Sequence, residues 1–353
     1  MIAHAYRAYK GFRGDVLAVP GRAIVFFGLL LLFFLPLIIQ DPYILRILTF
    51  SSLFAIFAAS WDVLTGYTGQ INLGHGLFFG VSAYSAALLN LKLGLPPLLT
   101  IPGGALASVV VGLIAGFPAL RVRGVYLALI TLSLPIILAG IVYATPKLTG
   151  GELGLLGVAP LSSSRILNYY ITLTTMICSG LTMWKLTDRK SSLIRLGIFL
   201  HAIREDEITA RASGINTTKY KLLAFGISGF FAGVAGGLYV HLIRVAGPST
   251  FELSFSFQPI MWAVFGGMGT ISGPVVGVYL LYPLIEFLRI IPEFRSLIFT
   301  LIIIFVILFM PKGLTVRVRE GIERECFKCK GINIITRRFC RVCDVSLHRG
   351  KEE

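Results

Sequence analysis

Four cysteines near the carboxyl terminus have the spacing of a metal site. Cys326 and Cys329 form one Cys-x-x-Cys pair, and Cys340 and Cys343 form a second pair after ten intervening residues. Four thiolates can surround Zn²⁺ tetrahedrally at about 2.3 Å, and such a site has no open position for a substrate. We therefore predict a structural zinc site. The alternative is a pair of disulfides or redox dithiols, which a reducing cytoplasm disfavours.

The spacing of these cysteines resembles that of a zinc ribbon over residues 326–343. A module this short cannot build a sufficient core alone, but metal binding can drive its folding. Phe327, Ile332, Ile334 and Phe339 are expected to supply a small apolar core.

The second chemical feature is a charged segment at residues 202–208, Ala-Ile-Arg-Glu-Asp-Glu-Ile. Each charge would cost roughly 2.5–3.5 kcal/mol inside lipid on insertion scales, so the segment lies in water. Asp206 can cap the start of a helix, and Gly214 can end it in the left-handed conformation. A short rigid helix of this kind can move with a partner subunit as a rigid body. A solvated helix without a partner is the alternative.

Two glycine-rich segments, 66–76 and 265–274, interrupt the apolar pattern. Glycine costs about 1 kcal/mol per helical position, and irregular backbone at membrane depth is tolerated where it packs in protein or lines a wet cavity. Paired breaks of this kind indicate a transport pathway. Tight turns with close helix contacts are the alternative. The predicted pathway residues are Gly69, Gln70, Asn72, Gly74 and His75.

Asp62 precedes the first glycine-rich segment. An acid inside a membrane is a functional candidate by default. Its expected place near the cytoplasmic interface makes plain solvation at least as favourable an interpretation.

The framework that positions these residues is set by composition. Hydrophobic residues make up 56% of the 353 residues, charged residues only 14%, and the mean hydropathy is +0.82, which excludes a soluble domain of 353 residues. We predict an all-α polytopic membrane protein with about ten transmembrane helices, broken at the glycine-rich segments, and a small carboxyl-terminal zinc ribbon. The predicted spans are 23–39, 45–65, 76–92, 98–119, 124–144, 166–185, 222–243, 256–268 (a shorter one), 274–291 and 295–310.

The distribution of charge predicts the topology. Most of the 32 Lys and Arg residues lie in residues 1–22, at Arg121 and Arg123, in 185–221 and in 312–353, all on one side of a ten-helix arrangement. The positive-inside rule makes that side cytoplasmic, with both termini there. Insertion topology explains the net charge of +15 better than nucleic-acid binding. The predicted parts are a basic segment 1–22, a permease domain 23–311 with a cytoplasmic loop 186–221, and a tail 312–353.

Several motifs, in sequence order, resemble those of LivM-type permeases, the membrane subunits of branched-chain amino-acid ABC importers. The resemblance covers about residues 45–314. Its motifs lie at 66–75 with 78–80 and 83–84, at 148–151, at 202–208 with 214–216 and 220–225, at 266–270 with 273–274, and at 310–314. The family usually has two arginines where this chain has residues 197–202, Gly-Ile-Phe-Leu-His-Ala, so the surface facing the ATPase is expected to differ.

The resemblance implies a permease subunit in a prokaryotic inner membrane, with membrane lipid around it. Its implied partners are a LivH-type permease, two ABC ATPase subunits and an extracytoplasmic substrate-binding protein, with leucine, isoleucine or valine as the solute. The chain has no Gly-x-x-x-x-Gly-Lys-Ser/Thr loop, so ATP hydrolysis falls to partners and the chain is expected not to be an enzyme. The residues expected to couple to the ATPase are Arg204, Glu205, Asp206, Glu207, Arg211, Gly214 and Ile215.

Two alternatives stay open. A related permease could carry urea or amides, sugars or nucleosides. A membrane-anchored zinc-ribbon protein could instead serve assembly or sensing, and it would function without an ATPase partner.

Overall fold

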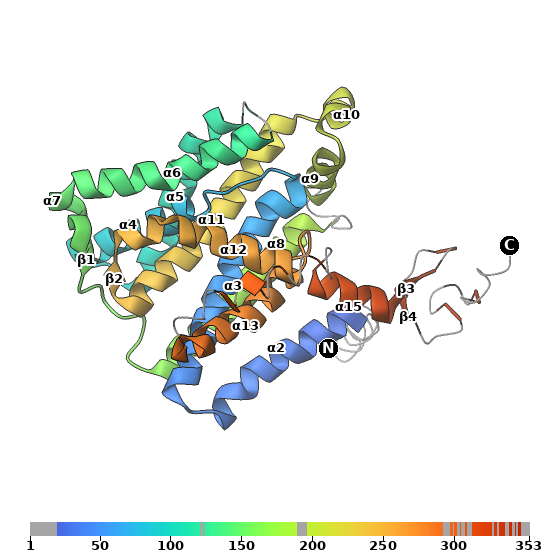
Figure 1. Ribbon diagram of the computed structural model, residues 1–353, viewed down its shortest axis with the longest axis horizontal. Coiled ribbons are helices and arrows are strands. Elements are labelled where there is room, and N and C mark those ends of the chain that lie inside the picture. Colours follow the sequence, from blue (N-terminus) through green and yellow to red (C-terminus); the bar gives the residue numbers. More distant parts are fainter. Residues whose placement is uncertain are drawn as a thin grey trace, which may run out of the picture. The chain divides into compact units, whose positions relative to one another are not determined.

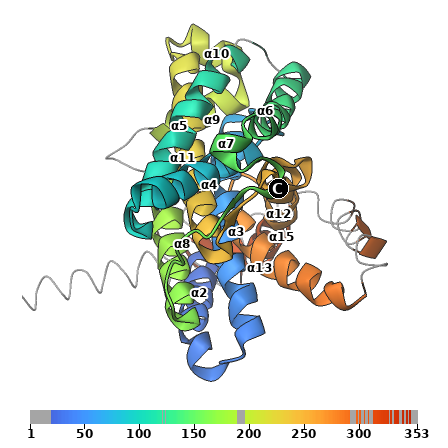
Figure 2. The ribbon, with the colours of Figure 1, turned by 90° about the vertical axis from the view of Figure 1, so that its left-hand side faces the viewer.

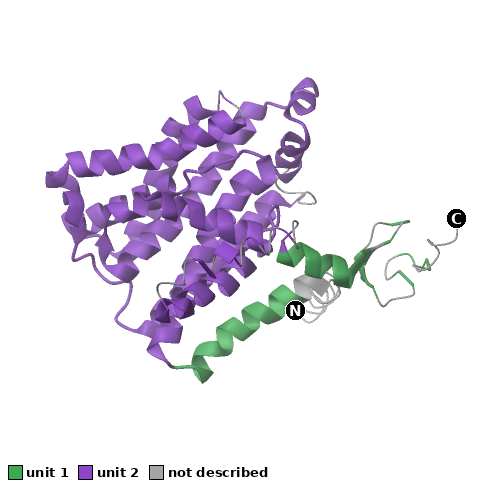
Figure 3. Cartoon of the chain, in the orientation of Figure 1, with its two compact units in different colours: residues 1–40, 314–353 green, residues 41–313 purple. Residues whose placement is uncertain are grey.

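In a computed structural model of the chain, the described residues are 20–120, 122, 124–188, 196–291 and 313–326, with 297, 298, 300, 301, 304, 308, 328, 329, 332–335, 339, 340, 343, 345 and 346. Helices dominate these residues (Figure 1). The chain divides into two compact units, one of residues 1–40 and 314–353 and one of residues 41–313 (Figure 3).

The larger unit holds the long helices. They are α3 (Pro42–Thr68), α4 (Gly76–Leu93), α5 (Pro97–Ala119), α6 (Val125–Ala144), α8 (Arg165–Thr187), α11 (Thr217–Ile243), α12 (Leu253–Gly266) and α13 (Ser272–Phe287). The shorter elements are α7 (Pro146–Thr149), η2 (Gly151–Leu153), β1 (Leu155–Leu156), α9 (Leu196–Glu205), α10 (Glu207–Ala212), β2 (Val245–Ala246), η3 (Pro248–Phe251) and η4 (Leu288–Ile290). β1 and β2 pair antiparallel.

Within the described residues, six helices are long and apolar enough to cross a membrane: α3, α4, α5, α6, α11, and α13 together with η4. α12 is short, as predicted, with 14 residues. α8 has 23 residues at the predicted place. The prediction of an all-α polytopic membrane protein is confirmed, while the predicted span 295–310 lies mostly outside the described residues.

α3 forms the centre of the larger unit. It packs against α8, α11, α12 and α13. Within its most apolar stretch of 18 residues, 94% of the residues are buried. Small residues allow this close packing, since Ala55, Ala58 and Ala59 bring neighbouring backbones near. Ser51 and Ser52 donate hydrogen bonds to carbonyls one turn earlier, at 2.9 Å each, so their hydroxyls are satisfied inside the bundle.

The smaller unit holds α2 (Pro20–Ile38), which contains the apolar run predicted at 23–39, and α15 (Leu314–Ile322), which packs against α2. After α15 follow β3 (Glu323–Glu325) and β4 (Ile332–Ile334), paired antiparallel. The predicted basic segment 1–22 lies almost entirely outside the described residues.

Both glycine-rich segments break the helices, α3 somewhat later and α12 slightly earlier than the predicted span ends at 65 and 268. α3 continues through Gly66 to Thr68 and ends at Gly69, whose φ of 72° is left-handed. α12 likewise includes Gly266 and ends at Gly267. The predicted break at Gly66 was wrong because a glycine inside a helix allows close packing, whereas only a left-handed residue forces the chain to turn.

Candidate functional site

The charged segment contains the predicted short helix, α10, and also the end of a second helix, α9, which was not predicted. α9 ends at Glu205, and α10 begins at Glu207 after Asp206. α10 lies at the end of the larger unit where α11 begins, in both views (Figures 1 and 2). Because α11 starts at Thr217, these helices connect the short stretch after α8 directly to a long central helix.

Both ends of α10 have the predicted caps. Asp206 Oδ1 accepts hydrogen bonds from the backbone N–H of Ile208 at 2.8 Å and of Thr209 at 3.2 Å, and Thr209 Oγ1 donates to Asp206 Oδ2 at 2.7 Å. The Thr209 bonds, with that from Ile208, lower the pKa of the Asp206 carboxyl below its ordinary value. At the other end, Gly214 has φ 83°, and the Ile215 N–H donates to Ala210 O at 3.1 Å. This pairing is a Schellman motif.

Glu207 fixes α10 to the start of α11. Its carboxylate accepts hydrogen bonds from Lys221 Nζ at 2.6 Å and from Arg211 at 3.2 Å, and its side chain is only 18% exposed. Lys221 is buried, which makes it a structural partner that the sequence did not reveal. Glu207 therefore faces its own chain.

The outer surface of α10 is different. Ile208 is 69% exposed although it is a large apolar residue. Glu205 is also exposed, at the end of α9. A single apolar side chain on a rigid, water-exposed helix is the kind of group that anchors a helix in a partner's groove.

The first glycine-rich segment folds back along α3. Trp61 Nε1 donates to the Asn72 carbonyl at 2.7 Å, and Ser60 Oγ lies 2.9 Å from His75 Nε2. His75 also stacks on Phe57, with ring centroids 5.0 Å apart. Residues 69–75 thus return about three helical turns alongside the helix that they follow.

The polar groups of this segment have different roles. Asn72 Nδ2 lies 3.2 Å from His75 Nδ1, and Asn72 Oδ1 accepts from the Gly74 N–H at 3.0 Å. A Cβ on Gly74 would lie 1.7 Å from the Thr131 carbonyl, so only glycine fits. Gln70 is buried, and within the described residues both of its amide atoms lack a hydrogen-bond partner. Of the five predicted pathway residues, Gln70 therefore has the polar group free to meet a ligand or water.

The two glycine-rich segments meet at Asp62. This side chain is 0% exposed, so the expectation of plain solvation was wrong. Its Oδ1 accepts from the Gly269 N–H at 2.8 Å, while Oδ2 has no partner within the described residues. Gly66 permits the contact, because a Cβ there would lie 2.8 Å from Gly269 N.

Arg204 contacts both segments from α9. A Cβ on Gly269 would lie 2.6 Å from Arg204 Nη1, and a Cβ on Gly69 would lie 3.7 Å from Arg204 Cα. The end of α9 therefore packs on both points at which the membrane helices break. A sequence cannot show this, since the three residues are far apart along the chain.

The four carboxyl-terminal cysteines come together as predicted. Their sulphur atoms all lie within 4.8 Å of one another, with 3.6 Å between Cys326 and Cys343 and 3.4 Å between Cys329 and Cys340. A tetrahedron with metal–sulphur bonds of about 2.3 Å has edges of about 3.8 Å, which is close to these distances. The donor set therefore fits a tetrahedral metal ion.

Two of the four residues predicted for the apolar core of this module are exposed, Phe339 to 60% and Ile334 to 39%. Ile332 is half-buried, and Phe327 lies outside the described residues. Among the described residues of the module, Cys326, Cys340 and Asn333 are buried, with Cys343 packed against the two buried cysteines. The Cys340 N–H donates to the Val345 carbonyl at 2.9 Å, and Asn333 Nδ2 donates to Cys340 Sγ at 3.5 Å. Within the described residues of the module, the cysteines form the buried apolar cluster.

Similarity to known proteins extends over most of the chain. Residues 43–307 match the family model described as "Branched-chain amino acid transport system / permease component". The chain is 29% identical, over 81% of its length and 73% of the relative's, to the high-affinity branched-chain amino acid transport system permease protein LivM of Salmonella typhimurium. It is 27% identical to the permease protein BraD of Pseudomonas aeruginosa, over 76% of this chain and 92% of BraD. No solved structure matches.

A shorter similarity reaches sugar permeases. The ribose import permease protein RbsC of Escherichia coli is 30% identical over only 25% of this chain and 29% of RbsC. The match to the family model spans the broken helices, α9 and α10, and so includes the residues that meet at Asp62. The chain belongs to the family of branched-chain amino acid transport system permease components.

Proposed function

We propose that this protein is the membrane permease subunit of an ATP-driven, binding-protein-dependent importer of branched-chain amino acids. It forms half of the translocation pathway beside a LivH-type permease. Two ABC ATPase subunits dock on its cytoplasmic side and an extracytoplasmic binding protein delivers the solute. The relatives named for branched-chain amino acid transport match across most of the chain, whereas the ribose permease matches only a quarter of it. This contrast favours leucine, isoleucine or valine over a sugar.

The observation that carries the proposal is the position of Arg204. It belongs to α9, beside the capped and water-exposed α10, and it contacts both glycine-rich segments. Movement of a docked ATPase would shift α10 and α9 as a rigid body, and the Arg204 contacts would pass the shift to the broken helices. The residues proposed for this coupling are Arg204, Glu205, Asp206, Glu207, Arg211, Gly214 and Ile215.

The internal contacts divide these residues by role. Glu207 and Arg211 hold α10 in place, and Asp206 and Gly214 define its ends. Glu205 and the exposed Ile208 face outward, where an ATPase would contact them. Gly69, Gln70, Asn72, Gly74 and His75 remain the proposed pathway residues, with Gln70 as the group that meets the solute or its water.

The test is reconstitution of the whole importer. The permease pair, the ATPase subunits and the binding protein are placed in liposomes, and ATP hydrolysis and leucine uptake are measured together. We expect both to rise when leucine-loaded binding protein is added. Stimulated hydrolysis with another solute, and none with leucine, would contradict the proposed solute. Absence of any ATPase from the purified assembly would contradict the permease role.

The orientation of the protein in the membrane can be tested by labelling introduced cysteines in cells that express it. With both termini in the cytoplasm, a cysteine introduced at Glu152 is expected to react with a membrane-impermeant maleimide in intact cells. A cysteine introduced at Thr218 should react only after the membrane is opened. The reverse pattern would contradict the proposed topology.

We also propose a structural zinc ion bound by Cys326, Cys329, Cys340 and Cys343. The four sulphur atoms lie within 4.8 Å of one another, and they supply a closed shell of thiolates. Metal analysis of the purified protein should give about one zinc per chain. A protein that purifies without zinc and with two disulfides would support the redox alternative.

A further inference from the structure

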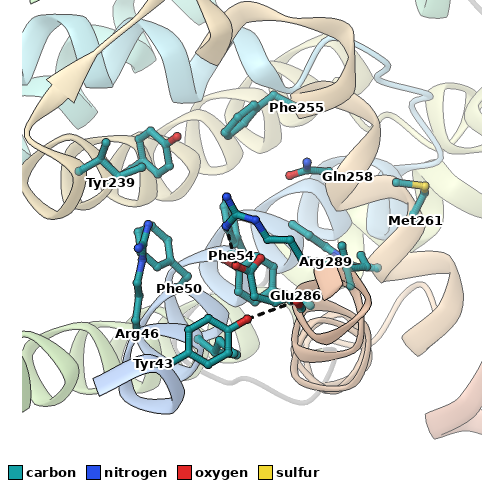
Figure 4. Close-up of a pocket in the computed structure, with 15 residues that line it drawn as sticks. Tyr43, Arg46, Phe50, Phe54, Tyr239, Phe255, Gln258, Met261, Glu286 and Arg289 are labelled. Atoms are coloured by element: carbon teal, nitrogen blue, oxygen red, sulfur yellow. Dashed lines mark hydrogen bonds and ion pairs between the residues drawn. The ribbon is translucent and has the colours of Figure 1, made fainter. Parts of the chain in front are cut away.

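A cavity of about 490 Å³ lies between α3, α11, α12 and α13 in the larger unit (Figure 4). It is separate from both glycine-rich segments. Arg46 and Gly69 stand at opposite ends of α3, roughly 35 Å apart at 1.5 Å per residue. Under the proposed topology the cavity opens at the extracytoplasmic end, where a binding protein releases its solute. Its volume falls in the range of about 300–1,000 Å³ that holds small ligands.

Charges of both signs line this cavity. Arg46 extends from α3, with its guanidinium 5.7 Å from the centre of the Phe50 ring, and it forms no ion pair with any acid among the described residues. Glu286 on α13 is largely covered, and it pairs with Arg289 at 3.1 Å. The Tyr43 hydroxyl donates to the Glu286 backbone carbonyl at 3.3 Å (Figure 4). A site with both a free cation and a covered carboxylate suits a ligand that carries both charges.

The wall of the cavity is aromatic. Phe54 lies at its centre, with ring centroids 5.2 Å from Trp262 and 5.1 Å from Tyr282. Phe255 lies 6.3 Å from Phe54 and faces the same space (Figure 4). The Trp262 indole N–H is buried and lacks an acceptor within the described residues. A buried donor without a partner is costly, and a ligand acceptor would satisfy it.

We infer that this cavity is a binding site for a zwitterionic α-amino acid with an apolar side chain. Arg46, with Arg289, binds the carboxylate, since guanidinium groups match carboxylate geometry. Glu286 binds the ammonium group. Phe54 and Phe255 cover the side chain, whose transfer from water to an apolar surface favours binding. The inference rests on the proposed function and gives the permease its own solute site, beyond that of the binding protein.

The experiment photolabels the permease pair, with its ATPase subunits, in nanodiscs. The probe is a diazirine analogue of leucine, and the binding protein is left out. After irradiation, the labelled peptides are identified by mass spectrometry. We expect label in residues 43–54 or 282–289, removed by excess leucine. Arg46→Gln and Glu286→Gln should each reduce the label about tenfold. Arg165→Gln and Glu152→Gln change exposed residues of the same charge outside the cavity, and should leave the label unchanged.

The results separate the two proposals. If the unmodified importer takes up leucine in liposomes but the label falls elsewhere, or is insensitive to both variants, the cavity is not the site and the proposed function stands. If the importer takes up no leucine, the proposed function fails and this inference with it. Label that anionic phospholipid displaces and leucine does not would assign the cavity to a lipid headgroup and overturn the inference.

Discussion

The backbone N–H of Gly269 donates a 2.8 Å hydrogen bond to Asp62 Oδ1. This bond joins the second glycine-rich segment to α3 just before the first one begins. Asp62 is fully buried and the Gly269 N–H is partly covered, so the carboxylate depends on this amide for a partner. The bond therefore links the two broken places of the membrane bundle.

Substitution of Asp62 tests this link. Asp62→Leu leaves the Gly269 N–H without an acceptor, and we expect a loss of about 1–3 kcal/mol in stability. Asp62→Asn keeps an acceptor oxygen for the Gly269 N–H, so its loss of stability should be clearly smaller. Thermal unfolding followed by size-exclusion chromatography in detergent measures both variants. Equal melting temperatures for Asp62→Leu and Asp62→Asn would contradict a stabilising role for this hydrogen bond.

The exposed surface of α10 yields a second prediction. Ile208→Asp should weaken retention of the ATPase subunits about tenfold or more, because burying a large apolar side chain contributes about 1.5–3 kcal/mol. Copurification at graded salt measures the retention. Thr218→Asp, at another exposed position nearby, is the matched control. Retention of the ATPase by Ile208→Asp at the level of this control would argue against docking on α10.

A third prediction concerns Glu205 and Glu207, which sequence reasoning treated alike. Glu205→Lys should weaken ATPase binding and leave the melting temperature unchanged, since Glu205 is exposed. Glu207→Lys should also lower the melting temperature, because it places a positive charge beside Lys221 and Arg211. Matching effects of the two changes on both measurements would show that the internal contacts of Glu207 have no consequence.

The cap at Asp206 gives a pH dependence. Its hydrogen bonds lower the carboxyl pKa from 3.8, so the ionised cap stabilises α10 above about that pH. The contribution is lost as the pH falls through the still lower pKa of the folded state. Hydrogen exchange of the amides at 207–212 should therefore show full protection at neutral pH and protection that declines as the pH falls below 3.8. Asp206→Asn caps without ionising, and its protection should vary less with pH.

The cysteine module gives the last prediction. Cys326→Ser should remove most bound zinc and the exchange protection of residues 323–326 and 332–334, because the cysteines form the buried apolar cluster among the described residues of the module. The melting temperature of the unfolding transition of the larger unit, residues 41–313, should not change. Cys178→Ser, a change to the exposed cysteine of α8, should retain the metal. Loss of zinc from both variants would point to a nonspecific effect.

Local chemistry allowed much of this structure to be predicted. The caps at Asp206 and Gly214 depend on residues within a few positions of each, and both were predicted correctly. The cysteine cluster was also predictable, since two Cys-x-x-Cys pairs are the spacing that lets four thiolates surround one metal ion. Long apolar runs gave the positions of the helices to within a few residues.

The remaining features depend on residues that are distant in the sequence. The contact of Asp62 with Gly269 spans 207 positions, and no local pattern indicates it. The burial of Lys221 against Glu207 was missed because a charge near a membrane interface is expected to be solvated. The cavity likewise combines the start of α3 with the end of α13.

The folded-back segment also constrains how the protein is made. The Gly76 N–H, at its end, donates to Ser256 Oγ at 3.1 Å, and these residues are 180 positions apart. The Leu73 N–H similarly depends on Thr131 Oγ1. A ribosome must therefore synthesise α6 and then α12 before this stretch of backbone has all its partners. Until then the amides of Leu73 and Gly76 lack these partners, so helices made late in synthesis complete the structure begun by α3 and α4.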